Sequence, residues 1–173
     1  MNNHPVKNGL LAGAAQIVFT MILYFVQPDF MLKWGSFVSY IILVYFMVKS
    51  VSMTKKDQLG FAAFGEAFKV SWLTFILGTT MMTLFTMLLM NYIDPSLLDK
   101  MKDIQIEALQ SMSGFFSIPE EEINKQISHL RASNPFGMEA IGFGLPFSFI
   151  FTGALFSLII DHTKKKKKPL TNP

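Results

Sequence analysis

The sequence has no cysteine in its 173 residues, and charged residues make up only 16% of it. Without a cysteine sulfur the chain has no disulfide bond, no thiol nucleophile and no thiolate metal site, although this absence identifies no cellular compartment. The scarcity of charge is more informative, because it leaves long apolar stretches between the charged residues. A soluble domain could hardly bury stretches of this length.

Motifs for catalysis are also lacking: there is no glycine-rich phosphate loop, no metal-ligand spacing and no nucleophilic triad. The three histidines, His4, His129 and His162, fall in three separate polar regions, so we expect surface histidines and no shared site. We therefore predict no catalytic, cofactor-binding or metal-binding residue and no enzymatic activity. An intramembrane enzyme would have only scattered carboxylates in its favour.

Four apolar runs dominate what is present, and they predict transmembrane helices over residues of about 9–27, 34–51, 68–91 and 138–160. At about 1.5 Å per residue the last two reach roughly 34 Å, enough to cross a bilayer core of about 30 Å. The hydrophobic fraction is 51% and the mean hydropathy is +0.39. The sequence therefore predicts an all-α, polytopic protein with four transmembrane helices, in which residues 1–173 form a single membrane domain.

The first two runs need separate arguments. The first could be read as a secretory signal, but it is too long and reaches Pro28 without a cleavage pattern, so we expect a retained span. The second has only about 15 residues from Trp34 to the charge at Lys49, which is short for a crossing. We favour a span to about Val51 because the Lys49 ammonium group can reach the interface. A re-entrant or interfacial helix stays open as the alternative.

The polar segment 94–135 follows the third run and predicts two amphipathic helices that form a hairpin. Asp94 is expected to cap the first helix, and Pro95 suits its first position. The second helix would open with a capping box at Ser117–Glu120 and end before Asn134. The apolar residues at helical spacing are Leu97, Met101, Ile104, Ala108 and Met112 in the first helix and Ile123, Ile127 and Leu130 in the second.

Basic residues predict the orientation. The expected loop 49–65 has three lysines and the tail 161–173 has five, whereas the segment 94–135 has four basic and seven acidic residues. Because cytoplasmic segments are enriched in lysine and arginine, we expect both termini in the cytoplasm and the acidic hairpin on the extracytoplasmic side. An even number of spans is consistent with termini on one side.

The basic residues of the tail are Lys164, Lys165, Lys166, Lys167 and Lys168, and without these five the net charge of +3 would be −2. Each lysine near an anionic leaflet contributes on the order of 1 kcal/mol. We therefore predict a membrane-surface anchor that binds anionic headgroups at the cytoplasmic face. One short basic run beside a span gives no support for nucleic-acid binding.

Glu66 and Lys69 stand three residues apart near the start of the third run, a spacing that places both on one helix face and allows an ion pair. The pair could belong to a proton- or ion-coupled site near the cytoplasmic entrance. The favoured interpretation is an interfacial anchor, with the pair at the headgroups and aromatic rings in lipid. These rings recur at steps of three and four at Phe61, Phe64, Phe68, Trp72 and Phe75.

Small and polar residues form stripes in three of the runs. Such stripes let helices approach closely and form hydrogen bonds between them, or else line a polar path. Packing is favoured because no run carries a charge near its middle. The stripes comprise Gly9, Gly13, Gln16, Thr20 and Tyr24 in the first run, Thr79, Thr83 and Thr86 in the third, and Gly153, Ser157 and Asp161 in the fourth.

Two short segments carry a family resemblance. Leu59–Lys69 reads LGFAAFGEAFK and is similar to the pattern G-x-x-[ST]-F-G-E-A-[FL]-K, with Ala63 where the pattern has a hydroxyl residue; Tyr92–Pro95 reads YIDP and is similar to Y-[IV]-[DN]-P. The chain resembles, over nearly its whole length, a bacterial family of small four-span membrane proteins known as domain of unknown function four-one-nine-nine. The resemblance implies a bacterial cytoplasmic membrane and brings no established activity or substrate. The candidate functional residues in the two segments are Glu66, Lys69, Asp94 and Pro95.

These features favour a non-enzymatic accessory subunit or scaffold that binds another membrane or envelope protein, because an amphipathic hairpin has apolar stripes to bury. If the stripes bury against each other, that reason weakens. The alternative is a small transporter or channel, which rests on the Glu66–Lys69 pair and the polar stripes. It would work as a homo-oligomer, because four spans enclose little volume alone.

Overall fold

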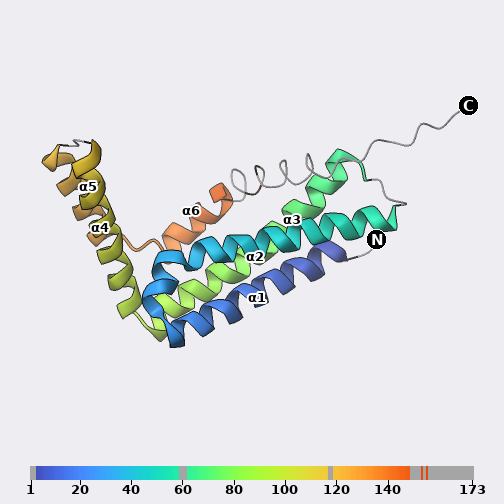
Figure 1. Cartoon of the computed structure of the whole chain (residues 1–173), viewed down its shortest axis with the longest axis horizontal. Helices are drawn as coiled ribbons and strands as arrows, with labels where there is room; N and C mark the ends of the chain where they lie inside the picture. The colour runs from blue at the N-terminus through green and yellow to red at the C-terminus, as the bar shows by residue number, and fades with distance from the viewer. Residues whose placement is uncertain (1–2, 59–61, 117–118, 149–152, 154, 156–173) are drawn as a thin grey trace, which may run out of the picture. The chain divides into compact units, whose positions relative to one another are not determined.

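The computed structural model describes residues 3–58, 62–116, 119–148, 153 and 155, and every regular element within them is helical (Figure 1). The elements are α1 (His4–Val26), α2 (Pro28–Asp57), α3 (Phe64–Leu88), the π-helix η1 (Leu89–Ile93), α4 (Ser96–Phe116), α5 (Glu120–Ala132) and α6 (Met138–Ser148). The predicted all-α class is confirmed. The chain divides into two compact units, unit 1 (Met1–Thr83 with Gly144–Pro173) and unit 2 (Leu84–Phe143).

Three helical segments are long and apolar enough to cross a membrane: His4–Val26, Pro28–Asp57 and Phe64–Ile93, the last of which joins α3 and η1. They coincide with the first three predicted runs and fit a multi-pass membrane protein. The fourth predicted run, 138–160, is described in part: its first eleven residues form the helix α6 (Met138–Ser148), and residues 149–152, 154 and 156–160 lie outside the described residues.

A single residue, Gln27, separates α1 from α2, although the sequence indicates a second span that begins only at residue 34. The Pro28 ring disfavours helical backbone at the residue before it, and Gln27 has φ −154° and ψ 75°. Proline suits the first turn of a helix, so α2 begins at Pro28 itself. The Gln27 N–H donates to the Leu23 carbonyl at 2.7 Å and its carbonyl accepts from the Met31 N–H at 3.1 Å, which satisfies one group of each helix end.

α2 is also longer than predicted at its other end. It has 30 residues and spans roughly 45 Å, so the short length that suggested a re-entrant or interfacial helix is not observed. The prediction of a loop from residue 49 is wrong, because residues 49–57 contain no glycine or proline that would end the helix. Lys55 and Lys56 lie in its last turn, where positive charge interacts favourably with the helix dipole.

Small residues bring the helices of unit 1 close together. A Cβ atom at Gly9 of α1 would lie 2.7 Å from the Leu77 Cβ of α3, and one at Gly13 would lie 2.7 Å from the Met81 Cβ. Real Cβ atoms do not approach so closely, so these contacts require glycine and support the packing interpretation of the first stripe. The buried apolar core consists of Ala12, Leu43, Met47, Val51, Ala67 and Phe75.

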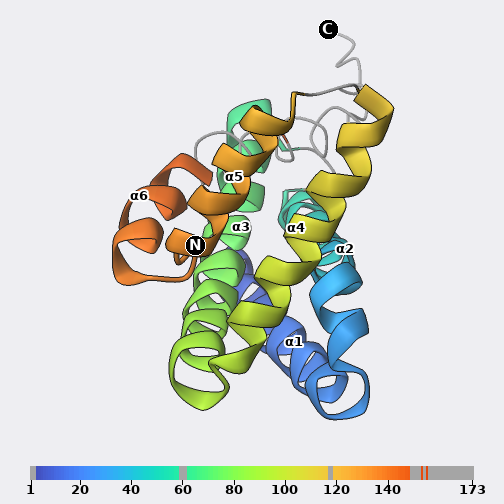
Figure 2. The same cartoon turned by 90° about the vertical axis from the view of Figure 1, so that its left-hand side faces the viewer.

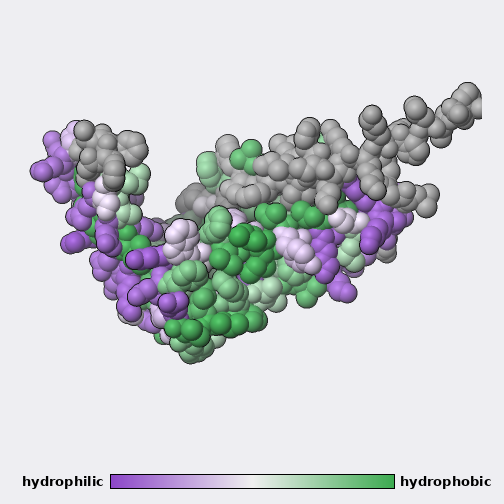
Figure 3. Space-filling view, viewed as in Figure 1, coloured by the Kyte–Doolittle hydropathy of each residue, from purple (hydrophilic) through white to green (hydrophobic). Residues whose placement is uncertain are grey.

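The outer surface of α1 and α2 is apolar as well, and Figure 3 shows it as a mainly green band. More than half of the side-chain surface is exposed at Val18, Ile22, Phe25, Phe37 and Ile41. Soluble monomers rarely expose a contiguous apolar surface of this kind, whereas lipid covers it in a membrane. The outer surface therefore agrees with the lengths of the helices.

In unit 2, α4 and α5 lie side by side and pack against each other as a helical hairpin (Figure 2). The Lys102 ammonium group joins them by donating to the Arg131 carbonyl at 3.0 Å. Among the residues of the predicted segment whose burial the structure describes, the buried apolar ones are Leu97 at 1% exposure, Ile106 at 7% and Ile123 at 9%. The two amphipathic helices are therefore present, with a small core between them.

Candidate functional site

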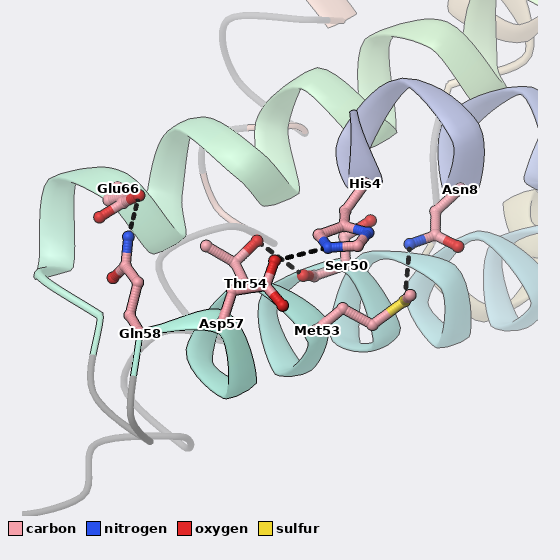
Figure 4. A network of polar contacts seen from close by, with 8 residues as sticks. All are labelled: His4, Asn8, Ser50, Met53, Thr54, Asp57, Gln58 and Glu66. Carbon is pink, nitrogen blue, oxygen red and sulfur yellow. Dashed lines mark hydrogen bonds and ion pairs between the residues drawn. The ribbon is translucent and has the colours of Figure 1, made fainter. Parts of the chain in front are cut away.

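Polar side chains gather in unit 1 where α1 and α3 begin and α2 ends, and we call this region the polar end (Figure 4). Its residues are His4, Asn8, Ser50, Met53, Thr54, Asp57, Gln58 and Glu66. The His4 Nε2 atom lies 2.7 Å from the Asp57 Oδ2 atom and links the first turn of α1 to the last turn of α2. The His4 side chain is only 20% exposed. The expectation of a surface histidine is therefore wrong for His4, because its ring is paired and largely covered.

Helix dipoles give this pair a physical role. A protonated histidine at a helix N-terminus and a carboxylate at a helix C-terminus each stand at the unfavourable end of the dipole. Where the imidazole of His4 carries a proton on Nε2, its contact with the Asp57 carboxylate offsets both unfavourable terms. The contact thus connects the first turn of α1 to the last turn of α2 and lowers the electrostatic cost of placing these two side chains at those helix ends.

Glu66, in the first turn of α3, accepts a hydrogen bond from the Gln58 side-chain amide (Figure 4). Lys69 is exposed, and within the described part of the chain no salt bridge joins it to Glu66. The predicted Glu66–Lys69 ion pair is therefore wrong. The i, i+3 spacing permits it, but α2 extends to Asp57 and places Gln58 beside the carboxylate. The transport hypothesis loses one of the two observations on which it rests.

Buried hydroxyl groups join the helices next to the polar end. The Ser50 Oγ of α2 and the Thr74 Oγ1 of α3 are 2.8 Å apart, and both residues are fully buried. Thr74 Oγ1 also lies 2.9 Å from the Val70 carbonyl and 3.3 Å from the Pro5 carbonyl of α1. A hydroxyl group has one proton to donate, so when Thr74 donates to a carbonyl, Ser50 donates to Thr74. One threonine thus contacts all three helices.

This hydroxyl cluster was not predicted from the sequence. Its signal was a recurrence of Ser50, Thr54, Ser71 and Thr74 at steps of three and four in otherwise apolar helices. Thr54 donates to the Ser50 carbonyl at 3.0 Å, and Asn8 of α1 places its Nδ2 3.6 Å from the Met53 sulfur. The Thr54 bond lies within α2, whereas the Asn8 contact joins α1 to α2. Polar contacts between helices hold them together where lipid offers polar groups no partner.

The predicted aromatic face of α3 is observed for three of its five members. Phe64 and Phe68 stack with centroids 6.3 Å apart, and Phe68 and Trp72 stack at the same distance. Phe75 departs from this surface and is fully buried. A Cβ at Gly153, in the fourth run, would lie 2.8 Å from the Phe75 ring, so this glycine packs against α3. Phe61 lies outside the described residues.

Asp94 and Pro95, in unit 2, have a local structural role. The Asp94 carboxylate accepts from the Ser96 N–H at 3.2 Å and from the Ser96 hydroxyl at 2.6 Å, and so caps the start of α4 as predicted. The Asp94 N–H donates to the Leu89 carbonyl at 2.7 Å and closes the π-helix η1. Pro95 is exposed and lies between the end of η1 and the start of α4.

A pair of asparagines closes the base of the hairpin, and the sequence analysis missed this contact. The Asn134 amide donates to the Asn91 side-chain oxygen at 2.8 Å, and the Asn91 amide donates to the Phe136 carbonyl at 2.9 Å. Asn91 lies in η1 before α4, and Asn134 follows α5. The pair therefore ties the two ends of the hairpin together across 43 residues.

The remaining predicted residues are not brought together. His129 is exposed on α5, and His162 and the lysine run 164–168 lie outside the described residues. In the part of the chain that the structure describes, no three His, Cys, Asp or Glu residues are grouped so that they could hold a metal ion. What the described polar side chains do is connect helix ends and helix faces.

The comparisons with known proteins give one match. The model of a protein family described as "Protein of unknown function (DUF4199)" matches residues 7–161, a segment that includes Glu66, Lys69, Asp94 and Pro95. No curated protein and no solved structure matches the chain.

Proposed function

This chain belongs to the family described as proteins of unknown function (DUF4199), and on that premise we propose that it is a non-enzymatic accessory or scaffold protein that binds another membrane or envelope protein. It crosses a bacterial cytoplasmic membrane four times. Residues 138–160 supply the fourth span, and the contact between Gly153 and Phe75 supports its packing against α3. Both termini lie in the cytoplasm and the hairpin lies outside, in accord with the distribution of lysine and arginine.

The observation that carries the proposal is the partly covered apolar stripe of the hairpin. Met101, Ile104, Ile127 and Leu130 are only half-buried, and Met112 is 52% exposed. A hairpin in water gains roughly 25 cal/mol for each Å² of apolar surface that a partner covers. The exposed part of the stripe, which includes Met112, therefore provides a surface for binding on the hairpin.

Charge indicates the chemistry of the partner. Glu120, Glu121 and Glu122 are all exposed in the first turn of α5, and they stabilise the helix through its dipole whether or not a partner is bound. The segment 94–135 carries seven acidic and four basic residues. The partner that fits has an apolar patch rimmed by lysine or arginine, because such a rim speeds association and orients it.

Site-specific photo-cross-linking tests the proposal. A photoreactive phenylalanine analogue at Met112 is expected to capture one partner in intact cells, whereas the same analogue at the neighbouring Ser111 is expected to capture far less. Both residues are exposed, but only Met112 belongs to the apolar stripe. With the photoreactive analogue placed at Leu109, the additional change Met112→Asp should weaken capture at least tenfold. The additional change Ser111→Asp should leave capture from Leu109 unchanged. Equal capture from positions 111 and 112, or copies of this chain alone, would contradict an accessory role.

The topology is tested separately, and the lack of cysteine makes that test clean. Gln110→Cys in the hairpin should react with a membrane-impermeant maleimide added outside the cell, and Lys56→Cys in α2 should react only after the membrane is opened. Both residues are exposed on the surface of the structure. Labelling of Lys56→Cys from outside would place the hairpin in the cytoplasm and redirect the search for its partner.

A further inference from the structure

Two polar atoms without a partner lie between α1 and α2. Gln16 is 3% exposed and Ser39 is 7% exposed, and the Gln16 Nε2 donates to the Ser39 carbonyl oxygen at 3.0 Å. Within the described residues, the Gln16 Oε1 and the Ser39 Oγ are buried and have no hydrogen-bond partner. One contact thus carries two unsatisfied oxygens from facing helices.

A 180° rotation of the Gln16 amide group, which exchanges Oε1 and Nε2, does not give the unpaired oxygens a partner. The carbonyl of Ser39 only accepts hydrogen bonds, so the Gln16 nitrogen must face it and the oxygen must point elsewhere. An unpaired polar group inside a protein costs about 1–3 kcal/mol, and lipid offers it no alternative partner. Both oxygens therefore favour a small molecule that can donate hydrogen bonds.

The helix packing is less close one turn from Ser39 than at three other glycines. At Gly9, Gly13 and Gly78 an added Cβ would meet an atom of another helix at 2.7 Å. At Gly35, which is buried one turn before Ser39 on the same face of α2, an added Cβ would meet only the Met31 side chain of its own helix, at 3.5 Å. No atom of another helix thus lies within 4 Å of that position, so the packing near Ser39 is compatible with a small molecule.

Charge decides what kind of molecule fits. No charged residue occurs in α1 after Lys7, and none occurs in α2 between Lys33 and Lys49. A cation beside Gln16 would lack a counter-ion in a medium of low dielectric constant, which makes its burial costly. A neutral molecule with two O–H groups avoids this cost and can bond both oxygens.

We propose that a water molecule occupies this position and bridges the Gln16 Oε1 to the Ser39 Oγ in the middle of the α1–α2 contact. The water donates to the Gln16 oxygen and exchanges a second hydrogen bond with the Ser39 hydroxyl. Buried waters of this kind satisfy polar groups that the protein leaves unpaired. Gln16 of the first stripe then takes part in a hydrated contact, whereas Gly9 and Gly13 make direct close contacts with α3.

Thermal unfolding of the full chain in lipid nanodiscs tests the bridge, because a bound water determines whether Ser39→Ala lowers or raises the unfolding midpoint. With a water in place, Ser39→Ala lowers the unfolding midpoint, and the double variant with Gln16→Leu loses less than the two single losses together. Without a water, Ser39→Ala removes a buried unpaired hydroxyl and raises the midpoint, which would overturn the proposal. Ser36→Ala is the matched control, because Ser36 is exposed on the same helix.

Two further measurements identify the molecule directly. An experimental density map that resolves waters should show a peak within about 2.6–3.2 Å of both oxygens. An empty position, or both oxygens bonded to protein groups, would overturn the bridge. The unfolding midpoint should be the same in sodium, potassium and choline chloride, and a midpoint that depends on one cation would replace the water by that ion.

Discussion

The long helices of unit 1 and the α4–α5 hairpin of unit 2 are both helical, but different contacts hold them together. In unit 1, glycines let α1 and α3 touch at Gly9 and Gly13, and buried hydroxyls pair at Ser50 and Thr74. In unit 2, a few apolar side chains are covered, and an asparagine pair closes the base. The difference fits lipid around the long helices of unit 1 and water around the α4–α5 hairpin.

Lipid is as apolar as a leucine side chain, so burying leucine between membrane helices gains little. Close van der Waals contact and hydrogen bonds must then hold the helices together, which explains the glycines and hydroxyls of unit 1. In water, burial of a large apolar side chain stabilises the folded state by roughly 1.5–3 kcal/mol. A hairpin in water can therefore be stabilised by a few well-covered residues, but the loss of one of them removes a large share of its stability.

Leu97→Ala should have the largest effect. Leu97 is 1% exposed in the first turn of α4, and truncation of such a residue costs about 2–5 kcal/mol. We expect the amides of α4 and α5 to lose most of their protection from hydrogen exchange, while those of α1 and α2 keep theirs. Mass spectrometry of the full chain in nanodiscs measures both regions at once.

Leu88→Ala is the matched control, because Leu88 is 52% exposed. Its exchange pattern should equal that of the unmodified chain. Equal loss of protection in both regions of the Leu97→Ala variant would mean that one cooperative unit, and not two, holds the molecule together.

Gly9→Val should have the next largest effect, and it acts on the other unit. Its added atoms collide with Leu77, and overpacking of this kind costs about 1–3 kcal/mol. The expected result is a lower unfolding midpoint for α1–α3 with unchanged exchange in α4 and α5. Gly65→Val provides the control, because no atom lies within 4 Å of a Cβ at Gly65. A Gly9→Val protein as stable as Gly65→Val would show that close contact does not hold unit 1 together.

Sequence patterns were sufficient to predict the class of fold and the approximate positions of the helices, but not both ends of α2. Apolar length predicted four spans, three of which coincide with helical segments long and apolar enough to cross a membrane, and the 3.6-residue period predicted α4 and α5. The capping role of Asp94 was also predictable, because a cap depends on residues next to it in the chain. Features that depend on neighbouring residues in the chain could therefore be predicted from the sequence.

Contacts between residues far apart in the chain could not be predicted from the sequence. Gln58 bonds Glu66, and His4 meets Asp57 across 53 residues, only because α2 continues through the segment expected to be a loop. The pairing of Asn91 with Asn134 likewise depends on how α4 and α5 fold back. No spacing rule within one helix predicts such partners, which is why the candidate ion pair of Glu66 with Lys69 was the wrong one.

His4→Ala should have the smallest effect of the three, and it measures what the polar end contributes to unit 1. The Asp57 side chain is 42% exposed, so water screens the pair, and exposed ion pairs contribute about 0–1 kcal/mol. The loss should stay local: amides in the first turn of α1 and the last turn of α2 should exchange less than tenfold faster, with the unfolding midpoint unchanged. His129→Ala, at an exposed histidine of α5, should alter neither region. A midpoint that falls as far as in Gly9→Val would mean that the polar end, and not the glycine contacts beside it, holds α1 against its neighbours.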